Sequence, residues 1–424
     1  MSETITKSII TCDLEGRIET FSQSASEVFG YDQTEIIGKK RVSLFSPGLT
    51  VLEHVPQWLS LAVKNGAHET KTVFVRKDGT RFPAKIKITP TFRNGKQIGY
   101  CGVTHPLPED QIASAAPAIS LSTRIFAGAV ITRAPFLTAT IVPVVIGAAL
   151  AKFHQTPWSW SLFMVALIGA CALQVAANTF NDYFDWKSGA DPQNNEYFLP
   201  FSGGSRSIEL GLITEKGLWN LSIMAMSIAT LCGLFLALQQ GPVILAYGLV
   251  GAFAAYFYTA PPLRLVARRG LGELFVGLCF GPLLCAGSYT AMTQQVRWES
   301  FAAGIPVGLL TTAILWINEF PDAASDAKVG KNHLVVTLGK KTARWGYLGL
   351  LAGAYLILGF LILTNVVPAL AALATLSLPI AASAVLILFK NYDRRELVAG
   401  NRNTILLQLL FGILMCVGVL LGTH

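Results

Sequence analysis

Residues 299–326 read ESFAAGIPVGLLTTAILWINEFPDAASD, an apolar run that ends in polar and acidic residues. The part from 299 to 319 is long enough to cross a lipid bilayer as a helix, which takes about 20 residues. Asn318, Asp322 and Asp326 follow one another at steps of four, so they share one face at the end of that helix. The sequence therefore predicts a membrane helix that carries carboxylates at one end.

Similar apolar runs occupy most of the chain, in which 52% of the 424 residues are hydrophobic and 14% are charged. So few charges are unusual for a soluble protein of this length. Besides 299–319, the runs lie near 127–151, 158–184, 217–238, 241–259, 271–292, 346–364, 367–389 and 404–421. We therefore predict an all-α polytopic membrane domain of about nine transmembrane helices over residues 123–424.

The basic residues between these runs are distributed very unevenly. Connections that follow an even-numbered run carry nearly all of them, such as Arg264, Arg268 and Arg269, whereas the others hold little beyond Lys152 and Arg297. By the positive-inside rule the basic connections face the cytoplasm. We expect a multi-pass protein of the cell inner (cytoplasmic) membrane with a cytoplasmic amino-terminal region. The net charge of +8 forms no single basic stripe, so no nucleic acid is expected as a partner.

The amino-terminal quarter of the chain is patterned like a soluble domain. Ile9–Cys12 and Ile18–Phe21 flank a turn, which predicts a hairpin. Asp78-Gly79 lies between two alternating runs and is a strong signal for a second hairpin. A last strand from Ile98 to Thr104 would complete a small antiparallel sheet.

The order of these pieces resembles a PAS domain. The likeness rests on DLEGRIETFSQSASEVFGY (13–31), EIIGKK (35–40), RKDGTRFPAKIKITP (76–90) and IGYCGV (98–103). It implies an α+β PAS sensor domain over residues 1–106, which would bind a small-molecule ligand or pair as a homodimer and could regulate the membrane domain. Residues 107–122 are rich in proline and small residues and predict a linker.

A second group of acidic residues lies in NTFNDYFDWKSGAD, residues 178–191, at the end of another apolar run. Its polar members are spaced by three and four residues and share one helix face: Asn178, Asn181, Asp182 and Asp185. Asp191 follows beyond the expected helix end. Both acidic clusters are therefore expected at the cytoplasmic ends of membrane helices.

Ionisable residues at membrane helices are costly and usually mark function. If the two clusters face one another, their hard oxygen ligands suit Mg²⁺ ions that bridge the oxygens of a bound diphosphate. The predicted substrate-binding residues are Asn178, Asp182, Lys187, Arg206, Arg264, Asn318 and Lys331, whose basic members would hold phosphate charge. The plain alternative is that any one of them is only a solvated residue at a helix end.

These residues resemble the UbiA superfamily of intramembrane prenyltransferases, and the likeness runs from about Arg133 to the C-terminus. The family's two aspartate motifs are matched by Asn181, Asp185 and Asp191 and by Asp322 and Asp326. Two further stretches extend the likeness, YTAPPLRLVARRGLGEL (258–274) and DAKVGKNHLVVTLG (326–339). The resemblance implies a Mg²⁺-dependent enzyme that moves a polyprenyl group from its diphosphate to a small aromatic acceptor.

The resemblance also implies roles for single residues. It assigns the metal to Asp185, Asp191, Asp322 and Asp326, and catalytic positioning to Asn181 and Tyr258. The long gap before Asp191 resembles the branch that prenylates 1,4-dihydroxy-2-naphthoate in menaquinone biosynthesis. Glu319 and Pro321 stand where naphthoate enzymes of the family usually carry asparagine and arginine, which leaves the identity of the acceptor open.

Two other interpretations stay open. Within the enzyme class, the prenyl group could go to another aromatic or to a lipid such as a glycerol ether. In a different class, a membrane sensor or cation-coupled transporter would place its carboxylates near the bilayer midplane, beside breaks in the helices. The predicted clusters instead lie at one edge of the membrane.

Overall fold

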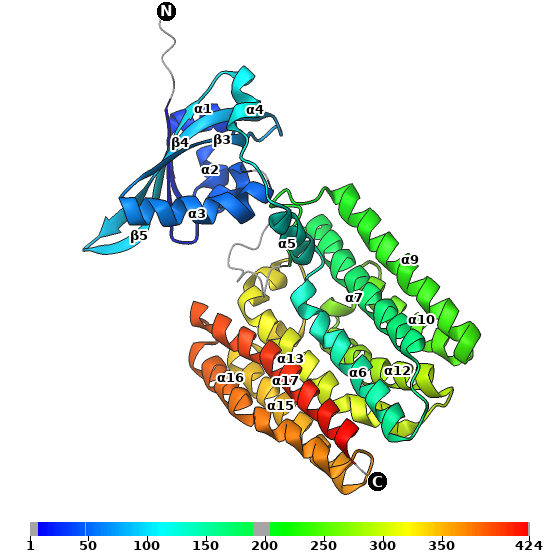
Figure 1. Ribbon diagram of the computed structural model, residues 1–424. Coiled ribbons are helices and arrows are strands. Elements are labelled where there is room, and N and C mark those ends of the chain that lie inside the picture. Colours follow the sequence, from blue (N-terminus) through cyan, green and yellow to red (C-terminus); the bar gives the residue numbers. More distant parts are fainter. Residues whose placement is uncertain (1–6, 47, 190–203, 423–424) are drawn as a thin grey trace, which may run out of the picture. The chain divides into compact units, whose positions relative to one another are not determined.

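The computed structural model describes residues 7–46, 48–189 and 204–422. The chain divides into two compact units (Figure 1). The first comprises Met1–Ile131 and Arg206–Thr214, and the second comprises Thr132–Ser205 and Glu215–His424. The predicted domain limits, with a linker at 107–122, remain a prediction.

The first unit is built on a five-stranded antiparallel sheet with the strand order β2-β1-β5-β4-β3. Its strands are β1 Ser8–Asp13, β2 Ile18–Phe21, β3 His68–Val75, β4 Arg81–Arg93 and β5 Lys96–Pro106. Its helices are α1 Gln23–Phe29, α2 Gln33–Ile36, η1 Val42–Phe45, α3 Leu49–Asn65, η2 Glu109–Gln111, α4 Ile112–Ala115 and α5 Leu121–Ile131. The expected antiparallel sheet is confirmed, whereas α3 had not been predicted as a separate element.

Local signals explain both hairpins of this sheet. The β1–β2 pairing sets Ile10 opposite Phe21. In the β3–β4 turn, the Asp78 carboxylate accepts a hydrogen bond of 2.8 Å from the Thr80 amide, and Gly79 adopts a φ of 84°, which glycine tolerates without steric cost. Phe29 packs among other aromatic rings beneath the sheet and anchors its core.

The second unit is a bundle of apolar helices (Figure 1). Its longer helices are α6 Thr138–Phe153, α7 Trp160–Ser188, α9 Glu215–Gln240, α10 Val243–Phe257, α11 Leu271–Leu278, α12 Leu284–Thr293, α13 Trp298–Lys328, α15 Lys340–Leu363, α16 Leu378–Asn391 and α17 Val398–Leu421. Short turns connect or extend them: η3 Ala134–Leu137, η4 Leu265–Ala267, η5 Cys279–Leu283, α14 Leu334–Leu338, η6 Ala369–Ser377 and η7 Arg395–Leu397.

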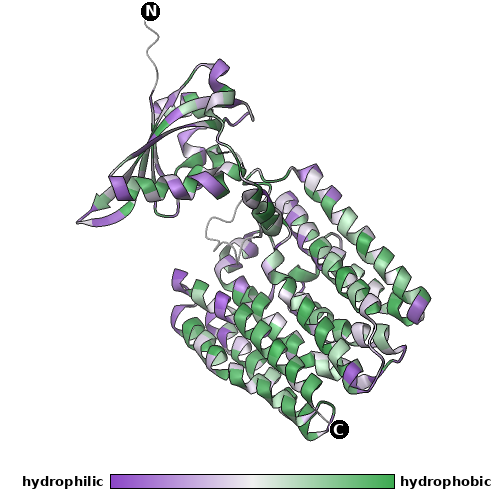
Figure 2. Cartoon of the chain, in the orientation of Figure 1, coloured by the Kyte–Doolittle hydropathy of each residue, from purple (hydrophilic) through white to green (hydrophobic). Residues whose placement is uncertain are grey.

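The membrane architecture agrees with the expectation of about nine spans. Among the described residues, 8 helical segments are long and apolar enough to cross a membrane, and α10, with 15 residues, is a shorter apolar helix between two of them. The first span begins at Ala134 rather than near 127, because residues up to Ile131 form the separate helix α5. Figure 2 shows the bundle helices as largely hydrophobic, with hydrophilic residues gathered at their ends.

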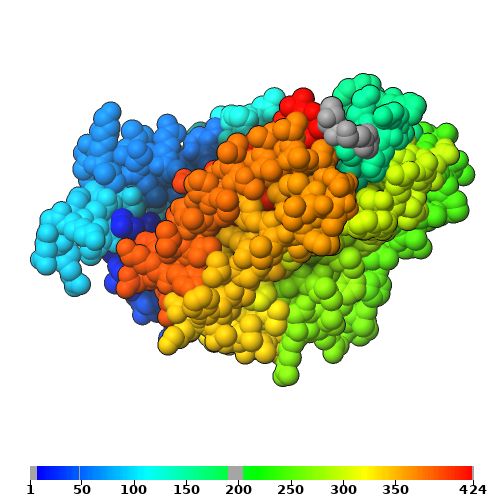
Figure 3. All heavy atoms as spheres, turned by 90° about the horizontal axis from the view of Figure 1, so that it is seen from below, coloured from blue at the N-terminus to red at the C-terminus, as the bar shows by residue number. Residues whose placement is uncertain are grey.

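Helix α13 lies at the centre of the bundle and is mostly buried. It packs against α15, α17 and the turn at Cys279–Leu283, where glycines let the backbones touch. A Cβ atom added to Gly304 would lie 2.6 Å from the carbonyl oxygen of Gly281. Small residues at such crossings are typical of membrane helix packing. Outside this core, α15 and α16 (orange in Figure 3) lie side by side along one face of the unit.

Candidate functional site

The first acidic cluster lies in the last turns of α7, which ends where Gly189 adopts the left-handed conformation. Two of its carboxylates are buried and point to different partners. Asp182 accepts hydrogen bonds from the guanidinium of Arg133 and, at 3.2 Å, from the amide of Ser205. Asp185 accepts one of 2.7 Å from the ammonium of Lys331. Asp182 is thus held by neighbouring backbone and side chains, whereas Asp185 turns toward the second cluster.

The amides of the first cluster are also fixed in orientation. The side-chain nitrogen of Asn181 donates to the Thr259 hydroxyl at 2.6 Å, and that of Asn178 donates to the Thr132 carbonyl at 3.1 Å. Because each nitrogen is committed, the side-chain oxygens face the other way. The oxygen of Asn181 accepts from Arg133 at 3.3 Å.

The second cluster occupies the last turns of α13. Asn318 accepts a hydrogen bond of 2.7 Å from Asn401 of α17, which connects this end of α13 to the last helix. After α13 the chain folds back, and the amide of Lys331 donates to the carbonyl of Asp326 at 2.9 Å. The ammonium of Lys331 then lies 2.7 Å from Asp185 and 3.8 Å from Asp326. One side chain therefore connects the carboxylates of α7 and α13.

A buried histidine completes the second cluster. The two ring nitrogens of His333 lie 3.3 Å from a carboxylate oxygen of Glu319 and 3.2 Å from one of Asp326. Burial by itself lowers the pKa of His333, but the two carboxylates outweigh it and raise the pKa to about 10. The imidazole ring thus lies between the two carboxylates. The sequence analysis quoted the stretch 326–339, which contains His333, but gave this residue no role, because it lies in a connection and not on the face shared by the aspartates.

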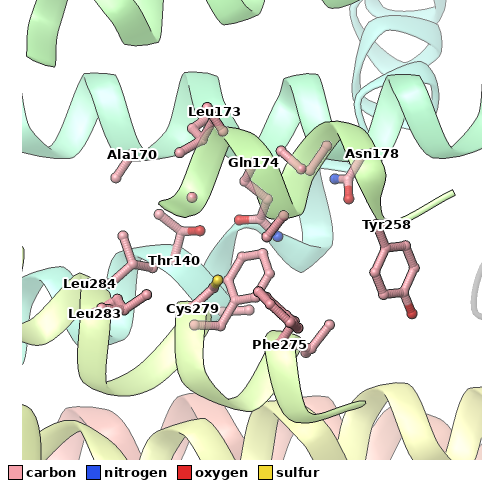
Figure 4. Close-up of a pocket in the computed structure, with 18 of the residues that line it drawn as sticks. Thr140, Ala170, Leu173, Gln174, Asn178, Tyr258, Phe275, Cys279, Leu283 and Leu284 are labelled. Carbon is pink, nitrogen blue, oxygen red and sulfur yellow. The ribbon is translucent and has the colours of Figure 1, made fainter. Parts of the chain in front are cut away.

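A cavity of about 650 Å³ runs from these carboxylates into the bundle. Its walls are mainly apolar, with Leu173, Phe275 and Leu283 among the residues that project into it (Figure 4). Acidic and amide side chains line its other end. The cavity therefore offers an apolar chamber with a strongly polar mouth, as a substrate with a charged head and a hydrocarbon tail requires.

The predicted site residues separate into two groups. Those that line the cavity are Asn178, Asn181, Asp185, Tyr258, Asn318, Asp322, Asp326 and Lys331. The others do not line it: Asp182, Lys187, Arg206 and Arg264. Asp191 lies outside the described residues. The cavity also exposes Gln174, Glu319 and His333, which the sequence analysis had not assigned to a site.

The residues that do not line the cavity have other contacts. Lys187 lies 3.3 Å from Glu215 and contacts the ring of Tyr183. Arg206 belongs to the segment grouped with the first unit and donates to Glu209 at 2.9 Å. Arg264 donates to the carbonyl of Val329 at 3.5 Å and so contacts the connection that carries Lys331. Their predicted roles toward phosphate remain predictions.

The donor set at the polar mouth fits a magnesium ion that a phosphate helps to hold. One oxygen of Asp185 is buried and has no hydrogen-bond partner among the described residues. Because Asp185 lines the cavity, this oxygen is available to coordinate a metal ion. Within the residues that the structure describes, no three Asp, Glu, His or Cys side chains lie close enough together to hold a metal ion without other ligands. Mg²⁺ usually takes one or two carboxylates and completes its shell with water and substrate phosphates.

The fold and the site together define a class: a multi-pass helical membrane enzyme with acidic residues from two helices at the mouth of an apolar cavity. Residues 140–411 match the UbiA prenyltransferase family, and residues 6–105 match the PAS domain. The chain therefore belongs to the UbiA prenyltransferase family and carries an amino-terminal PAS domain. The expected enzyme class, a prenyltransferase, is confirmed.

Individual relatives agree with this assignment. The chain is 29% identical to 1,4-dihydroxy-2-naphthoate octaprenyltransferase of Bacillus subtilis over 69% of its own length and 91% of that protein. It is 30% identical to the enzyme of the same name from Haemophilus influenzae, over 68% and 94% of the two chains. Among solved structures, a UbiA homolog from Aeropyrum pernix K1 covers 66% of this chain and 96% of its own, with a TM-score of 0.50 and 15% identity, and thus shares the fold.

Proposed function

We propose that this protein transfers a polyprenyl group from its diphosphate to 1,4-dihydroxy-2-naphthoate in menaquinone biosynthesis. The observation that carries the proposal is the convergence of Asp185 and Asp326, from separate helices, on Lys331 at the mouth of an apolar cavity. A polyprenyl diphosphate has the matching form, a charged head and a long apolar tail. The names of the Bacillus and Haemophilus relatives support the choice of aromatic substrate.

Magnesium would be held by Asp185, Asp322 and Asp326, together with Asp191, which lies outside the described residues. When bound, it supplies Lewis-acid stabilisation of the departing diphosphate. The ammonium of Lys331, already between two carboxylates, contributes positive charge at the same place. Asn181 is fixed by Arg133 and Thr259 and presents a rigid polar edge to the cavity.

The proposed transfer balances without a further reactant. The bond between the allylic carbon and the diphosphate oxygen breaks, and its electron pair leaves with the diphosphate. The ring carbon that carries the carboxylate forms the new carbon–carbon bond to the allylic carbon. The carboxylate then departs as CO₂, and its bonding pair restores the aromatic ring. The apolar walls exclude water, which would otherwise capture the allylic cation.

The orientation of the protein follows from its charged connections. The polar mouth lies at the ends of α7 and α13, next to connections rich in Lys and Arg, which the positive-inside rule assigns to the cytoplasm. We therefore place the site and the PAS domain on the cytoplasmic side of the inner membrane. A water-soluble aromatic substrate would reach the site from that side.

We also propose that the PAS domain regulates turnover by binding a small molecule or by pairing two copies of the chain. The support is the presence of a sensor-type domain on the same chain as the enzyme. A version lacking residues 1–110 should alter the transfer rate or its response to redox conditions. Identical rates under all redox conditions would reduce the domain to a tether.

The transfer itself is tested in membranes supplied with radiolabelled prenyl diphosphate, Mg²⁺ and the naphthoate. Asp322→Ala should abolish labelled product, because it removes a carboxylate from the polar mouth. Asp393→Ala is the matched control, since Asp393 is exposed and pairs with Lys340 away from the cavity. Normal transfer by Asp322→Ala would contradict the assigned role, and absence of product from the unmodified protein would contradict the function.

A further inference from the structure

The side-chain amide of Gln174, in the cavity wall, has its nitrogen hydrogen-bonded and its oxygen unpaired among the described residues. The side-chain nitrogen of Gln174, on α7, donates to the carbonyl of Phe136 at 2.8 Å. Because a carbonyl can only accept, this bond fixes which end of the amide is the nitrogen. The oxygen of Gln174 is consequently left on the cavity side, buried and without a hydrogen-bond partner among the described residues. Gln174 as a whole is only 5% exposed.

A hydroxyl that lines the same cavity is also unpaired among the described residues. Threonines in the helices of this unit, such as Thr179 and Thr311, donate to the carbonyl four residues earlier. For Thr140, on α6, that carbonyl belongs to Phe136 and is the one that Gln174 uses. The Thr140 hydroxyl is fully buried, lines the same cavity and has no partner in the described part of the chain. Figure 4 shows both side chains extending from their helices into the cavity.

Unpaired oxygens such as these in a mainly apolar wall are unusual, because a buried polar group without a hydrogen bond is costly. The pair requires a ligand that donates a hydrogen bond, since the oxygen of Gln174 can only accept. A diphosphate ionised by magnesium offers only accepting oxygens, and a prenyl tail offers neither donor nor acceptor. Of the two proposed substrates, only the aromatic one has hydroxyl groups that can donate a hydrogen bond to the oxygen of Gln174.

The position along α7 agrees with such a ligand. Gln174 precedes Asp185 by eleven residues on the same helix, which is about 16 Å along the helix axis. That distance leaves room for the diphosphate and the reacting ring carbon between them. Asn178, one turn nearer the mouth, lines the cavity in between. The hydroxyl that reaches Gln174 would be the one on the side of the ring away from the new bond.

We propose that Gln174 and Thr140 bind this distal hydroxyl and thereby make the enzyme specific for a dihydroxylated aromatic substrate. The proposal rests on the proposed function and deepens it. The Gln174 oxygen accepts the hydrogen of the substrate hydroxyl, and the Thr140 hydroxyl donates to its oxygen. An aromatic substrate without that hydroxyl would leave both groups unpaired, and sites of this kind reject such analogues strongly.

The test compares two substrates in the full-length protein: 1,4-dihydroxy-2-naphthoate and 1-hydroxy-2-naphthoate, which lacks only the distal hydroxyl. The unmodified protein should prefer the first by about 100-fold in kcat/KM. Gln174→Leu should reduce that preference to less than about tenfold, mainly through a higher KM for the dihydroxy compound. Its KM for the prenyl diphosphate should stay within about twofold, because the amide does not contact the charged head. Thr140→Val should act in the same direction.

The chain offers a closely matched control. Gln408, on α17, is also a fully buried glutamine whose nitrogen donates to a carbonyl of α6, that of Thr138, and whose oxygen is unpaired among the described residues. It does not line the cavity. Gln408→Leu should therefore keep the preference of the unmodified protein, while reporting any general effect of removing a buried amide.

The possible outcomes distinguish a wrong assignment of Gln174 and Thr140 from a wrong proposed function. If the unmodified protein transfers the prenyl group and Gln174→Leu retains its preference, the assignment of Gln174 and Thr140 is wrong while the proposed function stands. A change confined to the KM for prenyl diphosphate would also overturn the assignment, since it would place the pair against the other substrate. No transfer to either naphthoate by the unmodified protein would overturn the proposed function and the assignment together.

Discussion

The acidic clusters of α7 and α13 look alike in the sequence and differ in how the fold uses them. At the end of α7, Asp182 is held by Arg133 and a backbone amide, whereas Asp185, one turn later, lines the cavity. At the end of α13, both Asp322 and Asp326 line the cavity. A spacing of three or four residues thus identifies a shared face, but the neighbours of that face decide which carboxylates meet a ligand.

The clusters also differ in how their charge is compensated. Arg133, which precedes the first span, neutralises Asp182, while His333, which follows α13, bridges Glu319 and Asp326. Lys331 belongs to the second cluster in sequence but forms its closer contact, 2.7 Å, with Asp185 of the first. The two clusters are therefore one electrostatic unit, since a change in either alters the field at the other.

The sharpest test of this difference replaces the cavity carboxylate of α7. Asp185→Asn keeps the shape of the side chain and removes its charge, so transfer should fall by roughly 100-fold or more, as expected when electrostatic stabilisation of the reaction is lost. Thermal unfolding of the purified protein should change little, because the Lys331 ammonium keeps a second carboxylate, that of Asp326 at 3.8 Å, and the new amide can still accept from it. Full activity of Asp185→Asn at any Mg²⁺ concentration would remove the first cluster from the site.

The opposite pattern is expected for the carboxylate one turn earlier. Asp182→Asn removes the ionic contact between Asp182 and the partly buried Arg133 guanidinium, and breaking such pairs costs about 3 kcal/mol when burial is deep. We expect a clearly lower unfolding temperature in detergent, with transfer per folded molecule reduced less than about tenfold. A variant as stable as the unmodified protein but inactive would place Asp182 among the functional carboxylates.

The smallest effect is expected for Lys187, which the sequence analysis had assigned to phosphate binding. The structure instead shows an exposed side chain beside Glu215, and exposed ion pairs of this kind contribute little. Lys187→Gln should change the KM for prenyl diphosphate by less than about twofold, measured as transfer against substrate concentration. Lys331→Gln, which removes the buried ammonium, serves as the comparison and should change it far more.

Much of the architecture could be predicted from the sequence because its signals are local. Apolar runs of membrane length located the spans, and alternation around Asp78-Gly79 located a hairpin. The helix α3 was not predicted because Pro56 lies inside its apolar pattern, and a proline within such a pattern usually indicates the end of a helix. Helix α5 was merged with the first span because both are apolar and only a short connection separates them.

The site was predictable only where charge stood out against an apolar background. Asp185, Asp322 and Asp326 were identified for that reason, and all three line the cavity. Gln174 lies inside an apolar run, where a single uncharged amide carries no clear signal. The orientation of its amide depends on the carbonyl of Phe136, which the packing of η3 against α7 brings within reach.

The close backbone contact between α13 and the Cys279–Leu283 turn has a consequence for the range of isoprenoids that can be used. There is no space for even a methyl group between Gly304 and Gly281, so the cavity wall formed by Cys279–Leu283 cannot move outward against α13. Another part of the chamber is formed by α9 and α10, where Leu234 and Leu249 both line the cavity and are exposed. A longer chain can therefore extend past these two helices, so the surrounding acyl chains would share in determining product length.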